Sequence, residues 1–88
     1  MLKLLNGAGA DETGSAVMSP ADAWRWFFAG TWGGASIKLE ASPDNASWFE
    51  VATWSADGTA SVSGLQNCWM RARTVGGDGT TDLTVSAP

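Results

Sequence analysis

The sequence predicts an all-β fold, namely a small antiparallel β-sandwich or jelly-roll-like barrel of seven or eight short strands with a flexible N-terminal arm. Apolar and polar residues alternate with a period of two in several short runs, which is the pattern of a strand with one buried face. Clusters of Gly, Pro, Asp, Asn and Ser separate these runs at intervals of roughly 10–15 residues, as turns do between short strands. One run, residues 23–32, is rich in aromatic rings, which favour strands.

The length of 88 residues suffices for one compact domain and excludes a second. Residues 1–15 are expected to form a first strand, over residues 1–5, and then a Gly- and Ala-rich arm, while residues 16–88 form the sandwich. No apolar stretch matches an export signal or a membrane span, so we expect a soluble chain that is made in the cytoplasm.

The strands are assigned in chain order. A turn at residues 19–22 precedes the aromatic run, in which alternation directs Trp26 and Phe28 to the core and Arg25 to the opposite face. A helix over residues 21–29 is the alternative, because Pro20 is compatible with a helix start. The further expected strands are residues 35–41, 48–54, 59–63, 68–75 and 81–86. The expected core comprises Trp26, Phe28, Ile37, Leu39, Phe49, Val51, Met70, Leu83 and Val85.

The strand faces opposite this core carry the charged residues Lys38, Glu40, Glu50, Arg71 and Arg73. The simplest interpretation is a solvated sheet face with cross-strand ion pairs. The same alternation adds three Trp residues to these faces, and Trp and Arg are the residue types most enriched at interface hot spots. The candidate partner-binding residues are Arg25, Trp48, Trp54, Trp69, Arg71 and Arg73. A two-sided core, in which the N-terminal segment covers this face, is the alternative.

The composition disfavours catalysis and metal binding. The chain has no His and one Cys, Cys68, which removes His-based acid–base chemistry, disulfides and the common zinc-ligand sets. Asp44, Asp57 and Asp78 fall in predicted turns, where Asp bonds its own backbone. We therefore expect no enzyme, no catalytic residue, no cofactor and no metal site. The net charge of −4 disfavours nucleic acid and anionic membranes as partners.

The stretch FAGTWGGASIKLEASPD, residues 28–44, followed by Trp48 and by CWMRA at residues 68–72, resembles small proteins encoded among the virion genes of tailed bacteriophages. In those proteins a G-T-[WF]-G-G-A segment leads into a strand, then an S-P-D-G turn, a Trp and finally a strand that ends in Arg. The resemblance covers residues 28–85 and departs at Asn45, where Gly is usual.

The resemblance implies a β-rich structural component of the virion, namely a capsid decoration (cement) protein that binds and stabilises the outer surface of the head. It implies the major capsid protein or another virion protein as the partner, and location in the virion after synthesis in the host cytoplasm. It also implies a homo-oligomer, with trimers at three-fold positions, whose N-terminal arm orders on a neighbour. A tail or head-fibre component is the alternative, and no catalytic residue is transferred.

A carbohydrate-binding module is the alternative of a different class, because such modules are small β-sandwiches that stack sugar rings on exposed Trp. Trp48, Trp54 and Trp69 would form the platform, with Glu50 or Gln66 beside it. Coplanar, exposed rings would favour a sugar ligand, whereas rings sunk against another subunit would favour protein docking.

Overall fold

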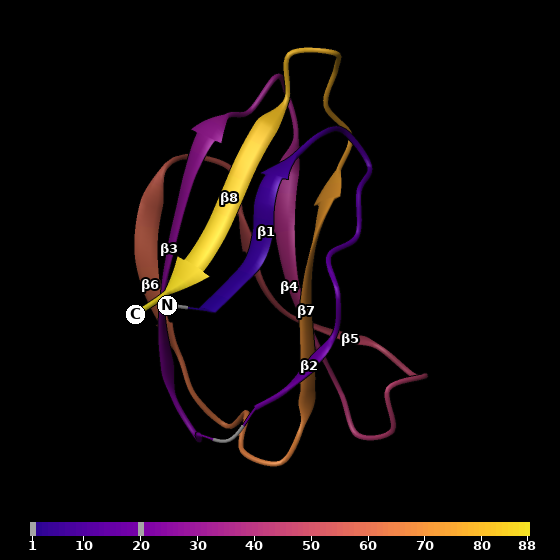
Figure 1. The fold of residues 1–88 in the computed structure, drawn as a ribbon, viewed down its shortest axis with the longest axis vertical. Helices are drawn as coiled ribbons and strands as arrows, with labels where there is room; N and C mark the ends of the chain where they lie inside the picture. The colour runs from indigo at the N-terminus through magenta and orange to yellow at the C-terminus, as the bar shows by residue number, and fades with distance from the viewer. Residues whose placement is uncertain (1, 20) are drawn as a thin grey trace.

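The structure, a computed structural model, describes residues 2–19 and 21–88, which form eight strands and no helix (Figure 1). The strands are β1 (Leu2–Ala8), β2 (Val17–Met18), β3 (Trp24–Thr31), β4 (Ser36–Ser42), β5 (Phe49–Trp54), β6 (Gly58–Val62), β7 (Trp69–Val75) and β8 (Asp82–Ala87). The all-β prediction is confirmed, and β3 lies where the alternative placed a helix. Met1, in the predicted first strand, and Pro20, in the predicted turn, lie outside the described residues.

The strands form two four-stranded antiparallel sheets, the first with the order β1-β8-β3-β6 and the second with the order β2-β7-β4-β5. β1 pairs with β8, β2 with β7, β3 with β6 and β4 with β5. The pairs β3–β8 and β4–β7 complete the sheets. This order is that of a jelly roll, in which one long antiparallel hairpin folds over so that successive strand pairs alternate between two sheets.

The inner faces of the two sheets enclose one apolar core. The predicted core residues that are buried are Trp26, Phe28, Ile37, Leu39, Met70, Leu83 and Val85. The core also contains Leu4 and Leu5 of β1 and Leu65 of the loop between β6 and β7, none of which is in the predicted core. The backbone N–H of Leu65 donates to the carbonyl of Asp22 at 3.0 Å, which holds this loop against the chain that enters β3.

The prediction that Phe49 and Val51 of β5 belong to the buried core is wrong. Phe49 is 63% exposed and Val51 is 43% exposed. Trp54 pairs with the fully buried Ile37, so the residues in phase with Trp54 turn toward the core. A register shift in the β4–β5 ladder leaves Val51 in a β-bulge, and Phe49 lies beyond this bulge on the edge strand.

The sequence predicts a flexible arm between β1 and β2, and the structure places this segment along β7 (Figure 1). The N–H of Gly14 donates to the carbonyl of Ala72 at 2.9 Å, and the N–H of Thr74 donates to the carbonyl of Glu12 at 2.8 Å. The segment therefore satisfies the backbone of β7 within one chain. It follows the edge of the second sheet and does not form the second layer of a two-sided core.

Candidate protein-binding face

The outer face of the second sheet gathers charged side chains from β4, β5 and β7. Residues that pair directly in an antiparallel ladder point to the same side of the sheet. Lys38 pairs with Arg73, and Glu40 pairs with Arg71 on one side and with Glu50 on the other, so all five lie opposite the core as predicted. We call this surface the arginine face, and it comprises Lys38, Glu40, Trp48, Glu50, Trp69, Arg71 and Arg73.

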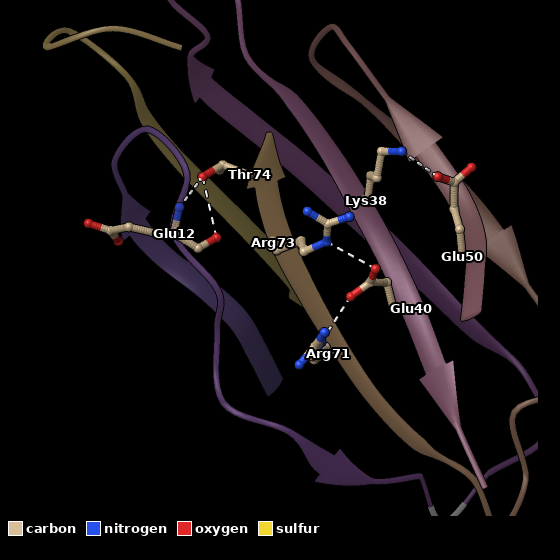
Figure 2. Close-up of polar contacts among 7 residues, drawn as sticks. All are labelled: Glu12, Lys38, Glu40, Glu50, Arg71, Arg73 and Thr74. Atoms are coloured by element: carbon tan, nitrogen blue, oxygen red, sulfur yellow. Dashed lines mark hydrogen bonds and ion pairs between the residues drawn. The ribbon is translucent and has the colours of Figure 1, made fainter. Parts of the chain in front are cut away.

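Glu40 lies at the centre of the arginine face and binds two arginines (Figure 2). Its Oε1 accepts a hydrogen bond from Arg71 Nε and its Oε2 accepts one from Arg73 Nε, both at 2.9 Å. The Glu40 side chain is 8% exposed, whereas those of Arg71 and Arg73 are 25% and 35% exposed. Burial raises the pKa of Glu40, but the hydrogen bonds and charges of the two arginines outweigh it, so the pKa lies below its ordinary value. The ionised carboxylate therefore fixes both guanidinium groups at neutral pH.

A second ion pair joins β4 to β5, because Lys38 Nζ lies 2.7 Å from Glu50 Oε1 (Figure 2). The hydrogen bond from Lys38, with one from Thr53, lowers the pKa of Glu50. Both side chains remain partly exposed, so the pair contributes little to stability. Because Lys38 pairs with Glu50, Glu40 is the carboxylate that the two arginines share.

Trp48 holds Arg71 from a second side. The Cζ atom of Arg71 lies 4.1 Å from the centroid of the Trp48 ring, which is a cation–π distance. The guanidinium group is thus held by Glu40 at its Nε and by the indole ring on its face. Ordering a long side chain is one of the costs of association, and here this cost is already met in the folded chain. Trp48 and Arg71 are therefore held in a fixed relative position in the folded chain.

The arginine face brings together four of the six predicted partner-binding residues, namely Trp48, Trp69, Arg71 and Arg73. The prediction that Trp54 lies on the outside is wrong, because its ring stacks on that of Phe28 in the interior. Arg25 lies on the outer side of the other sheet, where its Nη1 donates to Thr59 Oγ1 at 3.3 Å. The core therefore separates Arg25 from the arginine face.

Large exposed apolar side chains flank the arginine face at both edges of its sheet, namely Val51 in the bulge of β5 and Met18, which pairs with Trp69, on β2. Sequence reasoning missed this apolar rim, because the bulge that turns Val51 outward has no signal in the sequence. It also missed the burial of Glu40 between the two arginines. A signal for that burial exists, since arginines two residues apart share one strand face and two like charges there need a common counter-charge.

Asp44 and Asp78 bond the backbone of their own turns, as the sequence predicts, whereas Asp57 binds groups that are distant in sequence. Asp44 Oδ1 accepts hydrogen bonds from the N–H groups of Ser47 and Ala46, which lower the pKa of Asp44. Hydrogen bonds from the side chain and the N–H of Thr80 lower the pKa of Asp78. The remaining residue, Asp57, accepts a hydrogen bond from the indole N–H of Trp32 at 2.7 Å. All three carboxylates therefore hold loops in place.

Within residues 2–19 and 21–88 there is no pocket and no cluster of three or more His, Cys, Asp or Glu side chains that would hold a metal ion. The same residues contain no helix long and apolar enough to cross a membrane. Comparisons of the chain with protein-family models, with curated proteins and with solved structures find no match.

Proposed function

We propose that this chain is a virion structural protein of a tailed bacteriophage, a capsid decoration (cement) protein whose arginine face docks on the outside of the head. The observation that carries the docking is the group formed by Trp48, Arg71, Glu40 and Arg73, which fixes two arginines and an indole on one sheet face. The choice of the capsid as partner rests on the resemblance of residues 28–85 to virion proteins.

The chemistry of the arginine face supports docking over a bare, solvated surface. An ion pair that stays in water contributes little, whereas Arg and Trp that become desolvated at an interface are the commonest hot spots. The apolar rim adds to this, since covering Val51 and Met18 removes apolar surface from water at about 25 cal/mol per Å². A partner that covers both the arginines and the apolar rim gains binding free energy from the desolvated Arg and Trp contacts and from the buried apolar surface.

The turn after β4 supports the resemblance at the point where the sequence departs from it. Asn45 adopts a φ of 60°, the left-handed conformation that Gly adopts most readily and that Asn tolerates. The usual Gly and the Asn of this chain are therefore compatible with one turn geometry. The departure at this position does not change the local structure that the resemblance implies.

A sugar platform made of Trp48, Trp54 and Trp69 has less support. Trp54 stacks on Phe28 inside the sandwich, and Arg71 covers one face of the Trp48 ring. Three coplanar, exposed rings are therefore not present, and we do not advance a carbohydrate-binding function. A tail or head-fibre component would use the same arginine face on a different virion partner.

The proposal is tested with head shells of the phage that encodes the chain, assembled without it. We expect the purified chain to co-sediment with the shells and to raise their melting temperature in calorimetry. Arg71→Ala is expected to weaken binding by about tenfold or more, and the matched variant Arg25→Ala, on the other sheet, to leave it unchanged. Absence of binding, or equal losses in both variants, would overturn the proposal.

The location on the head and the oligomeric state belong to the same proposal. Binding to shells without a rise in melting temperature would favour a fibre or adhesin over a cement protein. Binding to purified tails and not to heads would favour the tail. A trimer, which the resemblance implies, is tested by measuring the mass of the chain in solution and by counting copies per shell.

A further inference from the structure

The charges of the arginine face do not cancel. Lys38 and Glu50 form a one-to-one pair, but Arg71 and Arg73 share the single carboxylate of Glu40. The face therefore has one positive charge in excess, although the whole chain has 9 acidic and 5 basic residues. The other acidic residues lie on the first sheet or in loops, as Asp44, Asp57 and Asp78 do. The arginine face is thus a local positive site on an acidic protein.

The two arginines also have unused hydrogen-bonding capacity. A guanidinium group has five N–H donors, and Arg71 and Arg73 each donate to Glu40 through Nε. Within residues 2–19 and 21–88 their terminal nitrogens donate no hydrogen bond to another side chain or to the backbone. In Figure 2 the two guanidinium groups extend away from each other on either side of Glu40. Each group therefore presents a separate fork to the outside.

From this geometry we infer that the arginine face recognises carboxylates, and that the partner surface presents at least two of them, one to each arginine. This inference rests on the proposed docking function and specifies the chemistry of the partner. The planar fork of a guanidinium group matches a carboxylate, which accepts two parallel hydrogen bonds. Arg71 and Arg73 are two residues apart on one strand, so their backbones are separated by about 6.6 Å. An acidic protein surface with carboxylates at a similar spacing fits this arrangement.

The distribution of charge favours an acidic protein patch over a polyanion. Nucleic acid carries one negative charge per about 1.7 Å of duplex and extends far beyond a single face. The acidic loops around the sandwich would repel such a polymer, whereas a small patch of carboxylates meets only the arginine face. The same loops disfavour other orientations of an acidic partner, so they help to set the direction of docking.

The test titrates the isotope-labelled full chain with an N-acetylated, C-amidated peptide that carries two Glu residues separated by one Ser. The control peptide has Gln in both Glu positions. We expect the Glu peptide to shift the Nε–H signals of Arg71 and Arg73 and the indole signal of Trp48, and the Gln peptide to leave them unchanged. The shifts should disappear at about 1 M NaCl, where charges are screened within about 3 Å.

Conservative variants separate recognition from folding. Arg71→Lys and Arg73→Lys keep the positive charge and lose the fork, so each is expected to weaken peptide binding several-fold while the melting temperature shows that the chain is folded. Arg25→Lys is the matched control and is expected to bind like the unmodified chain. Equal shifts with the Gln peptide, no shifts with either peptide, or stronger binding of a duplex DNA oligonucleotide would overturn the inference.

Shell binding distinguishes this inference from the proposed function. If the chain binds shells, but Arg71→Lys and Arg73→Lys bind them equally well and the Glu peptide gives no shifts, carboxylate recognition is wrong and docking stands. If the Glu peptide binds as expected and no shell or tail does, the virion function is wrong and carboxylate recognition stands.

Discussion

The indole ring of Trp54 stacks on the phenyl ring of Phe28, with the ring centroids 4.1 Å apart and the planes 9° from parallel. Trp54 lies on β5 of the second sheet and Phe28 on β3 of the first, so the stack joins the two sheets. Gly58, on the neighbouring strand β6, has no side chain, which leaves room for the Phe28 ring. The stack therefore packs the edge of the sandwich at which β5 and β6 lie.

Replacing Trp54 with Ala is expected to lower the free energy of unfolding by about 2–4 kcal/mol, because the substitution removes a large, partly buried ring and its aromatic partner contact. Trp48→Ala removes a ring from the outer face and is expected to cost less than about 1 kcal/mol. Urea denaturation followed by circular dichroism measures both values. A larger loss for Trp48→Ala than for Trp54→Ala would contradict the assignment of the two rings to opposite faces of the sheet.

Glu40→Gln is expected to destabilise the fold at neutral pH by about 1–2 kcal/mol, because it leaves two neighbouring guanidinium groups without their shared counter-charge. The expected loss is smaller than for a fully buried ion pair, because both arginines remain in contact with water. Glu50→Gln, at the exposed pair with Lys38, is the matched control and is expected to cost less. Equal losses would mean that Glu40 does not organise the arginine face.

The effect of Glu40→Gln should depend on pH. The pKa of Glu40 in the folded chain lies below its ordinary value of 4.5, so the ionised carboxylate favours the folded state. Its contribution is complete above pH 4.5 and is lost as the pH falls through the lowered pKa of the folded state. The difference in unfolding free energy between the two chains should therefore shrink as the pH falls below 4.5 and through the lowered pKa of Glu40. A constant or growing difference would contradict this.

The strands that alternate without interruption could be predicted from the sequence, and β7 shows why. Met70 and Ala72 are apolar and alternate with the charged Arg71 and Arg73, so only one phase of the strand places the charges outside. On β5 both phases contain an aromatic and an apolar residue, and hydrophobicity does not choose between Phe49 with Val51 and Ala52 with Trp54. The pairing of β5 with β4 decides which of these residues are buried, and no local sequence pattern indicates this pairing.

The N-terminal segment shows a second limit of sequence reasoning. Its Gly, Ala, Asp and Ser residues are typical of a loop, and the backbone hydrogen bonds that hold it to β7 depend on contacts distant in sequence. Polar and small residues at an edge give no apolar alternation from which a strand could be predicted. The charged members of the arginine face were predictable, whereas the shared use of Glu40 required the register of three strands.

Gly14→Ala is expected to destabilise the chain by about 2–3 kcal/mol. A Cβ atom at Gly14 would overlap the carbonyl oxygen of Leu4 and lie 3.2 Å from that of Ala72, so the obstacles are backbone atoms of both sheets. Gly79→Ala is the matched control, because a Cβ atom there meets no atom within 4 Å. Thermal unfolding of both variants tests this, and a Gly14→Ala chain as stable as Gly79→Ala would mean that the segment does not lie between the backbones of β1 and β7.

Phe49→Thr and Val51→Thr are expected to change the free energy of unfolding by less than about 0.5 kcal/mol each, because both side chains are exposed and Thr suits an edge strand. Phe28→Thr is the matched control from the core and is expected to cost about 3 kcal/mol or more, since it removes a buried ring. Exposed apolar residues on an edge strand promote association, so the two β5 variants should also associate less at high concentration in light scattering. A loss for Phe49→Thr close to that for Phe28→Thr would place Phe49 in the core and contradict its 63% exposure.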